Sequence, residues 1–171
     1  MGLRGTKSTS TPMKLNLKLT TIEYARLLKT IDDPRKTYDP LLDGIPSYQQ
    51  LVGKLIYLAT RLNICFAVQV RNQFMQCPKR SHWEAAMRVL RYLKKSPGRG
   101  ILLKRSCINS LTVFCDANWA SCPNTKRSIT GYVVQLGGSL ISWKSRSKDT
   151  VSRSSTKAEY RNVAAAVAEV N

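Results

Sequence analysis

The sequence has few acidic residues. Only 10 Asp and Glu stand against 28 Lys and Arg among 171 residues, which gives a formal net charge of +18. The excess is concentrated in residues 79–161, which hold 17 Lys and Arg but only four Asp and Glu. Such a surface favours polyanions, with nucleic acid as the first candidate. The same excess also arises in a segment cut from a longer protein whose acidic part lies elsewhere.

Long apolar runs are also lacking. Residues 1–12 are polar and contain no apolar stretch of the kind that a secretory signal peptide needs. The longest apolar run, around residues 55–59, is far too short to span a bilayer. We therefore expect an intracellular protein, in the cytoplasm or nucleus, without a membrane partner.

The five cysteines form no close pair, and their number is odd. This spacing is unlike that of a disulfide framework and indicates a reducing compartment. Cys65 and Cys115 lie in apolar runs, so we expect them to be buried thiols. Cys107, Cys115, Cys122 and His82 have the side chains of a zinc site. Their spacing, however, matches no CxxC pattern.

Apolar residues make up 43% of the chain and aromatic residues 8%, which is sufficient for a folded core. Breaker residues cluster in residues 1–46, which we expect to be loosely ordered apart from a short helix at residues 22–29. Helical periodicity dominates residues 47–99, and short β-rich runs dominate residues 100–171. The chain therefore divides into three segments with these bounds.

Three helices are expected in residues 47–99. Ser47 can cap a first helix from residue 48, Asn63 a second that ends before residue 78, and Ser81 a third through residue 95. The core side of the third helix should carry the apolar residues 83, 87, 90 and 93. Its other side carries the basic residues Arg88, Arg91 and Lys95, which could follow a phosphate backbone. The alternative is an ordinary solvated helix face.

Strands are expected at residues 101–103, 111–116, 130–136 and 140–143, followed by a helix capped by Ser154 or Ser155. Gly137-Gly138 between two β-rich runs predicts a hairpin. The fold class is therefore α/β, with mostly antiparallel strands plus one helix. A polar loop after the last strand carries basic residues that are further candidates for nucleic-acid binding: Lys144, Arg146, Lys148 and Arg153.

Two carboxylates stand out in this region. Asp116 follows an apolar run at the end of a predicted strand, and Glu159 lies in the first turns of the predicted last helix. A pair of carboxylates can hold a divalent cation for phosphodiester chemistry. Taken singly, each residue is explained as well by a turn or by the helix dipole.

Several motifs, in order, carry a family resemblance. They are residues 48–61 (YQQLVGKLIYLATR), 82–94 (HWEAAMRVLRYLK), 114–120 (FCDANWA), 127–132 (RSITGY), 141–145 (ISWKS) and 154–160 (SSTKAEY). The first two resemble the end of the reverse transcriptase region in Pol polyproteins of copia-type plant retrotransposons. The other four resemble the N-terminal half of that family's ribonuclease H domain. The resemblance implies a helical post-palm segment at residues 47–99 and an incomplete ribonuclease H-like domain at residues 100–171.

The resemblance also implies roles for the two carboxylates. Asp116 would match the strand-borne ligand that bridges two Mg²⁺ ions, and Glu159 the helix-borne ligand of one of them. In that chemistry the metals cut the RNA strand of an RNA–DNA hybrid. Two further aspartates of the family pattern fall beyond Asn171. We therefore expect an incomplete metal site in a truncated fragment without independent catalysis. No Tyr-x-Asp-Asp string of the polymerase palm is present.

The resemblance leaves two other functions open. The chain could be a basic module that binds RNA–DNA hybrid. It could also be labelled a secreted effector through the string Arg88-Val89-Leu90-Arg91, although no export signal precedes that string. Half a sheet would expose an unpaired edge and an apolar face, so we also predict self-association.

Overall fold

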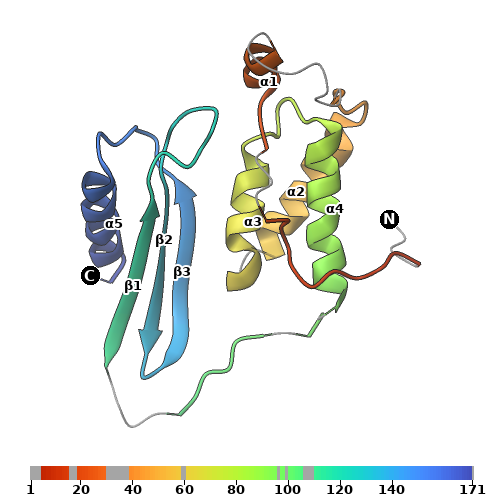
Figure 1. Ribbon diagram of the computed structural model, residues 1–171. Coiled ribbons are helices and arrows are strands. Elements are labelled where there is room, and N and C mark those ends of the chain that lie inside the picture. The colour runs from red at the N-terminus through yellow and green to blue at the C-terminus, as the bar shows by residue number, and fades with distance from the viewer. Residues whose placement is uncertain are drawn as a thin grey trace. The chain divides into compact units, whose positions relative to one another are not determined.

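A computed structural model describes residues 5–15, 19–29, 39–58, 61–95, 97–98, 100–105 and 110–170. The chain forms two compact units, Met1–Arg99 and Gly100–Asn171. The first unit is helical, and the second combines a sheet with one helix (Figure 1). Part of the segment that we expected to be loosely ordered, residues 30–38, lies outside the described residues.

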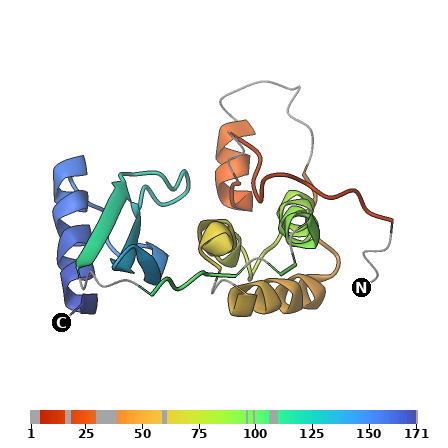
Figure 2. The same ribbon diagram turned by 90° about the horizontal axis from the view of Figure 1, so that it is seen from below.

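The first unit contains α1 (Ile22–Lys29), α2 (Ile45–Leu58), α3 (Leu62–Asn72) and α4 (Arg80–Lys95). Helix α1 has the bounds expected from the sequence. Figure 2 looks along α3 and α4 and shows α2 crossing both. A short antiparallel bridge joins Leu41 to Lys79 and fixes the chain before α2 against the start of α4.

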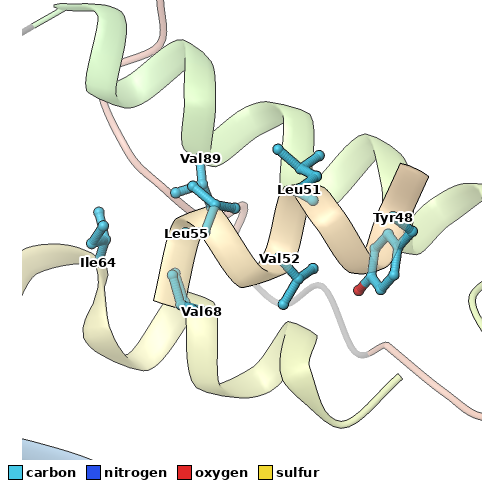
Figure 3. Packing of buried hydrophobic residues seen from close by; sticks show 9 residues of the cluster. Tyr48, Leu51, Val52, Leu55, Ile64, Val68 and Val89 are labelled. Carbon is cyan, nitrogen blue, oxygen red and sulfur yellow. The ribbon is translucent and has the colours of Figure 1, made fainter. Parts of the chain in front are cut away.

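The core of this unit lies between α2, α3 and α4. Figure 3 shows Leu51, Val52 and Leu55 of α2 meeting Ile64 and Val68 of α3 and Val89 of α4. The α2 residues recur at helical spacing, and this pattern is what made the helix predictable. Complete burial of one such aliphatic side chain stabilises the fold by about 2 kcal/mol.

The helix starts differ from those expected. Helix α2 begins at Ile45, because Pro46 occupies its first turn, where the missing N–H group costs nothing. Helix α3 has Arg61 at its N-cap and no side-chain cap, so the predicted cap by Asn63 is wrong. At α4, Ser81 is itself bound by Asp39, whose carboxylate accepts from the Ser81 N–H (3.1 Å) and hydroxyl (2.7 Å).

The buried side of α4 also differs. His82, Ala85, Ala86 and Val89 are its buried residues, whereas the apolar residues expected there are only partly buried. The small alanines allow α4 to lie close to its neighbours. Trp83, Met87, Leu90 and Leu93 then pack around the margin of the core.

The second unit is built on an antiparallel sheet of β1 (Leu111–Asn118), β2 (Ile129–Leu136) and β3 (Ser139–Ser147), in the order β1-β2-β3. The hairpin is confirmed: Gly137 and Gly138 have φ values of 54° and 79°, as a tight two-residue turn requires. The strand predicted at residues 101–103 is wrong, since the described residues 100–105 form no regular structure.

Helix α5 (Ser155–Val170) packs against β1 and β2. Its cap is confirmed, because the Ser154 hydroxyl accepts a hydrogen bond from the Lys157 N–H at 3.2 Å. Ala158, Asn162 and Ala166 recur at helical spacing and form its buried side. The unit therefore has the mixed helix and antiparallel-sheet composition expected of the α/β class.

Much of β1 is exposed, and the strand lies at one edge of the described sheet. Phe114 on this strand is 57% exposed. Cys115 is also exposed and Cys65 is only half-buried, so the prediction of two buried thiols is wrong, whereas Cys122 is buried. In the described part of the chain, no helix combines the length and apolar character needed to cross a bilayer.

Candidate metal and nucleic-acid sites

Asp116 lies near the end of β1, and its side chain is exposed. Its position in the sheet is fixed through the backbone: it pairs with Gly131 of β2, and its carbonyl oxygen accepts a hydrogen bond from the Asn162 amide at 2.7 Å. The same amide nitrogen donates to the Gly131 carbonyl at 2.9 Å. One side chain of α5 therefore bonds both partners of a register pair.

Glu159 lies on α5, one residue after the buried Ala158 and three before Asn162, and its side chain is exposed. Helix α5 contacts β1, so the structure places the two predicted carboxylates on directly contacting elements. Asn162 was missed at the sequence level. The signal available was a polar residue in line with Ala158 and Ala166 on the helix side that faces the sheet.

The described residues do not supply a complete metal site. Among them, no group of three or more His, Cys, Asp or Glu side chains lies together in a way that could hold a metal ion. Two carboxylates alone do not fit two Mg²⁺ ions, each of which prefers six oxygen ligands. Cys107, one of the four residues of the zinc alternative, lies outside the described residues.

Glu169, the other acidic residue of α5, lies at a different place. It lies beside the Tyr132 hydroxyl of β2, and burial together with this carboxylate raises the pKa of Tyr132 to about 12. Ten residues separate it from Glu159 along the helix, a rise of about 15 Å. Glu169 is therefore not a third ligand for Asp116 and Glu159.

Basic side chains gather around β3 and the loop that leads to α5. Lys144, Arg146 and Arg153 are exposed and Lys148 is half-buried. Arg146 forms an ion pair with Asp149 at 3.3 Å, but both side chains are largely exposed, so water and salt weaken this pair. The predicted residues thus present mostly uncompensated positive charge.

Two residues extend this surface onto α5. Lys157 and Arg161 are exposed and four residues apart, so they lie on one side of the helix. Arg161 donates to the Thr150 hydroxyl at 3.0 Å, which places that side of α5 beside the basic loop. Their spacing was the signal that sequence analysis did not use.

The basic stripe of α4 is partly covered. Residues 5–15, which we call the N-terminal strap, run along this helix. Arg88 donates to the Thr11 hydroxyl at 2.8 Å and Lys94 to the Thr6 carbonyl at 3.1 Å. Arg91 is half-buried, whereas Lys95 is exposed. The alternative of an ordinary solvated helix face is therefore wrong for Arg88.

A polar network at the start of α4 was not predicted. Lys79 is 4% exposed, and its ammonium group lies 3.2 Å from the Asp39 carboxylate and donates to the Thr20 hydroxyl at 3.2 Å. Burial raises the pKa of Asp39. The hydrogen bonds from Ser81 and Lys79 outweigh that effect and hold this pKa below its ordinary value.

His82 joins this network through the backbone of Lys79. Its ring is fully buried and stacks on Phe74 with centroids 4.0 Å apart, and its Nδ1 accepts from the Lys79 N–H at 3.1 Å. Burial, reinforced by the nearby Lys79 charge, lowers the pKa of His82 to about 4. The imidazole is therefore neutral at pH 7, in the form that Nδ1 needs to accept the bond.

Arg71 of α3 is also buried, with 1% exposure. Burial lowers its pKa to about 10, and Arg88 contributes to this shift. The Tyr48 hydroxyl donates to the Arg71 carbonyl at 3.0 Å, and burial raises the pKa of Tyr48 to about 12. An arginine among apolar core residues is an unusual feature, because burial of a charge is costly.

Sequence comparison finds clear relatives. The Pol polyprotein of transposon RE2 from Arabidopsis thaliana is 41% identical over 159 residues, which are 92% of this chain and 10% of that polyprotein. The Pol polyprotein of transposon RE1, from the same plant, is 47% identical over 118 residues, which are 68% of this chain and 8% of that polyprotein. The chain thus spans about a tenth of the length of these relatives.

A relative with a different name is secreted RxLR effector protein 161 of Plasmopara viticola. It is 38% identical over 124 residues, which are 71% of this chain and 87% of that protein. In this chain the string Arg88–Arg91 lies inside α4, where Val89 is fully buried. The string is therefore part of a packed helix.

No family model matches the chain. No solved structure matches it either. The evidence for a family is instead the agreement of plant transposon relatives across most of its length. The chain belongs to the retrovirus-related Pol polyproteins of plant transposons.

Proposed function

We propose that the chain is a copia-type Pol segment that binds RNA–DNA hybrid through its phosphates and does not cut it by itself. Its first unit would derive from the helical post-palm part of a reverse transcriptase, and its second from a ribonuclease H-like domain. The observation that carries this proposal is the contact between β1, which bears Asp116, and α5, which bears Glu159.

The order of elements supports the ribonuclease H-like part. Three antiparallel strands in the order β1-β2-β3, followed by a helix on β1 and β2, carry the motifs in which the resemblance was found. Asn162 bonds the helix to the backbone at Asp116 itself. The two acidic residues are thus held on a common framework, and both side chains are accessible.

The small number of metal-ligating carboxylates argues against independent cleavage. Hydrolysis of a phosphodiester by two metal ions needs ligands that fix both ions about 4 Å apart. The described residues contribute Asp116 and Glu159 and no further member of such a group. We therefore assign these two carboxylates an ancestral role as metal ligands.

Charge supports the binding part. The surface formed by Lys144, Arg153, Lys157 and Arg161 is exposed and has no ion pair among the described residues. Each phosphate contact that such side chains make releases a condensed counterion, so binding should weaken steeply as salt rises. Binding of this kind does not depend on base sequence.

The cleavage test uses the purified chain, a fluorescently labelled RNA–DNA hybrid and Mg²⁺. We expect no cleavage above that of the Asp116→Asn variant, which keeps the size of the side chain but removes its charge. Cleavage by the wild type that is lost in Asp116→Asn would overturn the assignment of a non-catalytic segment.

The binding test measures the affinity for the same hybrid by fluorescence anisotropy across a range of salt. We expect log Kd to rise linearly with log salt, and the slope to fall by about one for each phosphate contact removed in Lys157→Gln or Arg161→Gln. Arg80→Gln is the matched control, because Arg80 on α4 already pairs with Glu84 at 3.7 Å. An affinity that does not change with salt would contradict the proposal.

A further inference from the structure

Arginine side chains from two helices converge on the N-terminal strap. Arg71 comes from α3 and Arg88 from α4. Arg71 donates through Nη1 to the Ala67 carbonyl and through Nη2 to the Pro12 carbonyl at 3.5 Å. Arg88 donates to the Thr11 hydroxyl at 2.8 Å. Because Thr11 and Pro12 are consecutive, the guanidinium groups of Arg71 and Arg88 lie close to each other.

This cluster has no acidic partner in the described part of the chain. The ion pairs found there join Lys79 to Asp39, Arg80 to Glu84 and Arg146 to Asp149. The Nε atoms of Arg71 and Arg88 are buried, and among the described residues each lacks a hydrogen-bond partner. Positive charges and unused donors are thus gathered where only neutral acceptors meet them.

A phosphate group supplies the negatively charged acceptors that Arg71 and Arg88 lack. Its negative oxygens accept charge-assisted hydrogen bonds, which are shorter and stronger than bonds to a hydroxyl or a carbonyl. A guanidinium group presents its donors in a planar fork that matches two oxygens of one phosphate. Two neighbouring guanidinium groups with free Nε–H donors would therefore bind an oxyanion more strongly than they bind the neutral acceptors of the strap.

We propose that Arg71 and Arg88 form a phosphate-binding site that the N-terminal strap covers, and that a nucleic-acid phosphate displaces the strap. The Thr11 hydroxyl and the Pro12 carbonyl occupy the places that phosphate oxygens take. The inference rests on the proposed function for the source of the phosphate, and it adds a site on the first unit that the motifs did not indicate.

The contacts of the strap are suited to displacement. Two of its hydrogen bonds to α4 are long: the Thr9 N–H donates to the Arg91 carbonyl at 3.5 Å, and the Thr9 hydroxyl to the Arg88 carbonyl at 3.4 Å. Met13, by contrast, packs against the core of α2, α3 and α4. Residues 6–12 can therefore leave α4 while the strap stays anchored at Met13.

Arginine Nε–H signals in a ¹⁵N-labelled sample of the whole chain provide the first test. Sodium phosphate is titrated against sodium chloride at equal ionic strength. We expect the signals of Arg71 and Arg88 to shift saturably with phosphate, while that of the exposed Arg80, which pairs with Glu84, does not. Equal shifts in the two salts, or equal shifts at Arg80, would overturn the site. This test needs no variant.

The second test uses a short oligodeoxythymidine as the probe. Thr11→Val removes the acceptor of the Arg88 bond but keeps the shape of the side chain, so it should tighten oligonucleotide binding by about two- to tenfold as the strap loosens. Thr11→Ser retains a hydroxyl and should bind like the wild type. If Thr11→Val binds no more tightly than Thr11→Ser, the strap does not compete for the site.

The third test separates this site from general binding. Arg71→Met should weaken oligonucleotide binding and lower its salt slope by about one. Unchanged binding in both Arg71→Met and Arg88→Met would refute the site and leave the proposed function intact. Wild-type protein that shows the phosphate shifts but binds neither oligodeoxythymidine nor the RNA–DNA hybrid would refute the proposed function and restrict the site to free phosphate.

Discussion

Acidification should destabilise the helical unit through His82. The imidazole is fully buried and lies against the Lys79 backbone and the Phe74 ring. Protonation would place a cation in the core close to the Lys79 ammonium group. It would also abolish the acceptor at Nδ1 that binds the Lys79 N–H. Both effects favour the neutral ring.

The size of the effect follows from the pKa. Burial, with the Lys79 charge as the second cause, lowers the pKa of His82 from 6.5 to about 4. Between these values the unfolded chain binds more protons than the folded one. Stability is therefore fully present above pH 6.5 and is lost as the pH falls toward 4. A shift of about 2.5 units corresponds to a loss of about 3 kcal/mol.

The assay is simple because the chain contains one histidine. Its Cε1–H proton gives a single NMR signal, whose titration should have its midpoint near pH 4 in the folded protein and near 6.5 in urea. Urea unfolding is then followed by the fluorescence of Trp83, which is adjacent to His82. The other two tryptophans are removed by Trp119→Phe and Trp143→Phe, so that Trp83 is the sole source of the signal.

His82→Asn is the matched control, because its Oδ1 can still accept the Lys79 N–H bond but does not titrate. The unfolding free energy of this variant should stay flat between pH 6.5 and 4.5. Asp39 adds little in this range, because hydrogen bonds from Ser81 and Lys79 hold the pKa of its carboxyl below its ordinary value. A folded-state midpoint at or above pH 6 would refute the reasoning.

Three further outcomes are expected. Arg71→Leu should raise the unfolding free energy by about 2–3 kcal/mol in urea titrations, because it removes a buried charged group. Burial lowers the pKa of Arg71 to about 10, which sets the size of this effect. Arg80→Leu, at an exposed position, should bring no gain. Asn162→Ala should cost about 1–3 kcal/mol, measured as faster hydrogen exchange across α5, because two hydrogen bonds to the sheet are lost. Phe114→Lys should reduce self-association in analytical ultracentrifugation, since it places a charge on the exposed strand β1; unchanged association would show that this strand is not the contact.

Local patterns predicted the elements of the fold well. The apolar spacing in α2, the Gly137-Gly138 turn and the Ser154 cap each depend on residues close together in the sequence, and the structure confirms all three. The short run at residues 101–103 has a β-rich composition but no strand partner among the described residues. Composition alone therefore overpredicted strand there.

Contacts between distant residues were not predictable in this way. Asp39 takes the capping role at α4 from 42 residues upstream of Ser81, and the strap reaches Arg88 from 77 residues upstream. Exposure of Cys115 depends on what covers β1, which an apolar run does not reveal. The two carboxylates were found because each lies in a motif, whereas Asn162, which joins their elements, lies outside one.

The contact of Asn162 with the sheet fixes where α5 sits along its own axis. Ala158, Asn162 and Ala166 follow one another at intervals of about one turn, so alanine packing alone would be similar if the helix slid by that distance. Only Asn162 can donate to the carbonyls of Asp116 and Gly131. A displaced helix would leave a buried amide without partners and would carry Glu159 about 5 Å away from its observed level. A single amide thus selects one of several sterically similar docking positions.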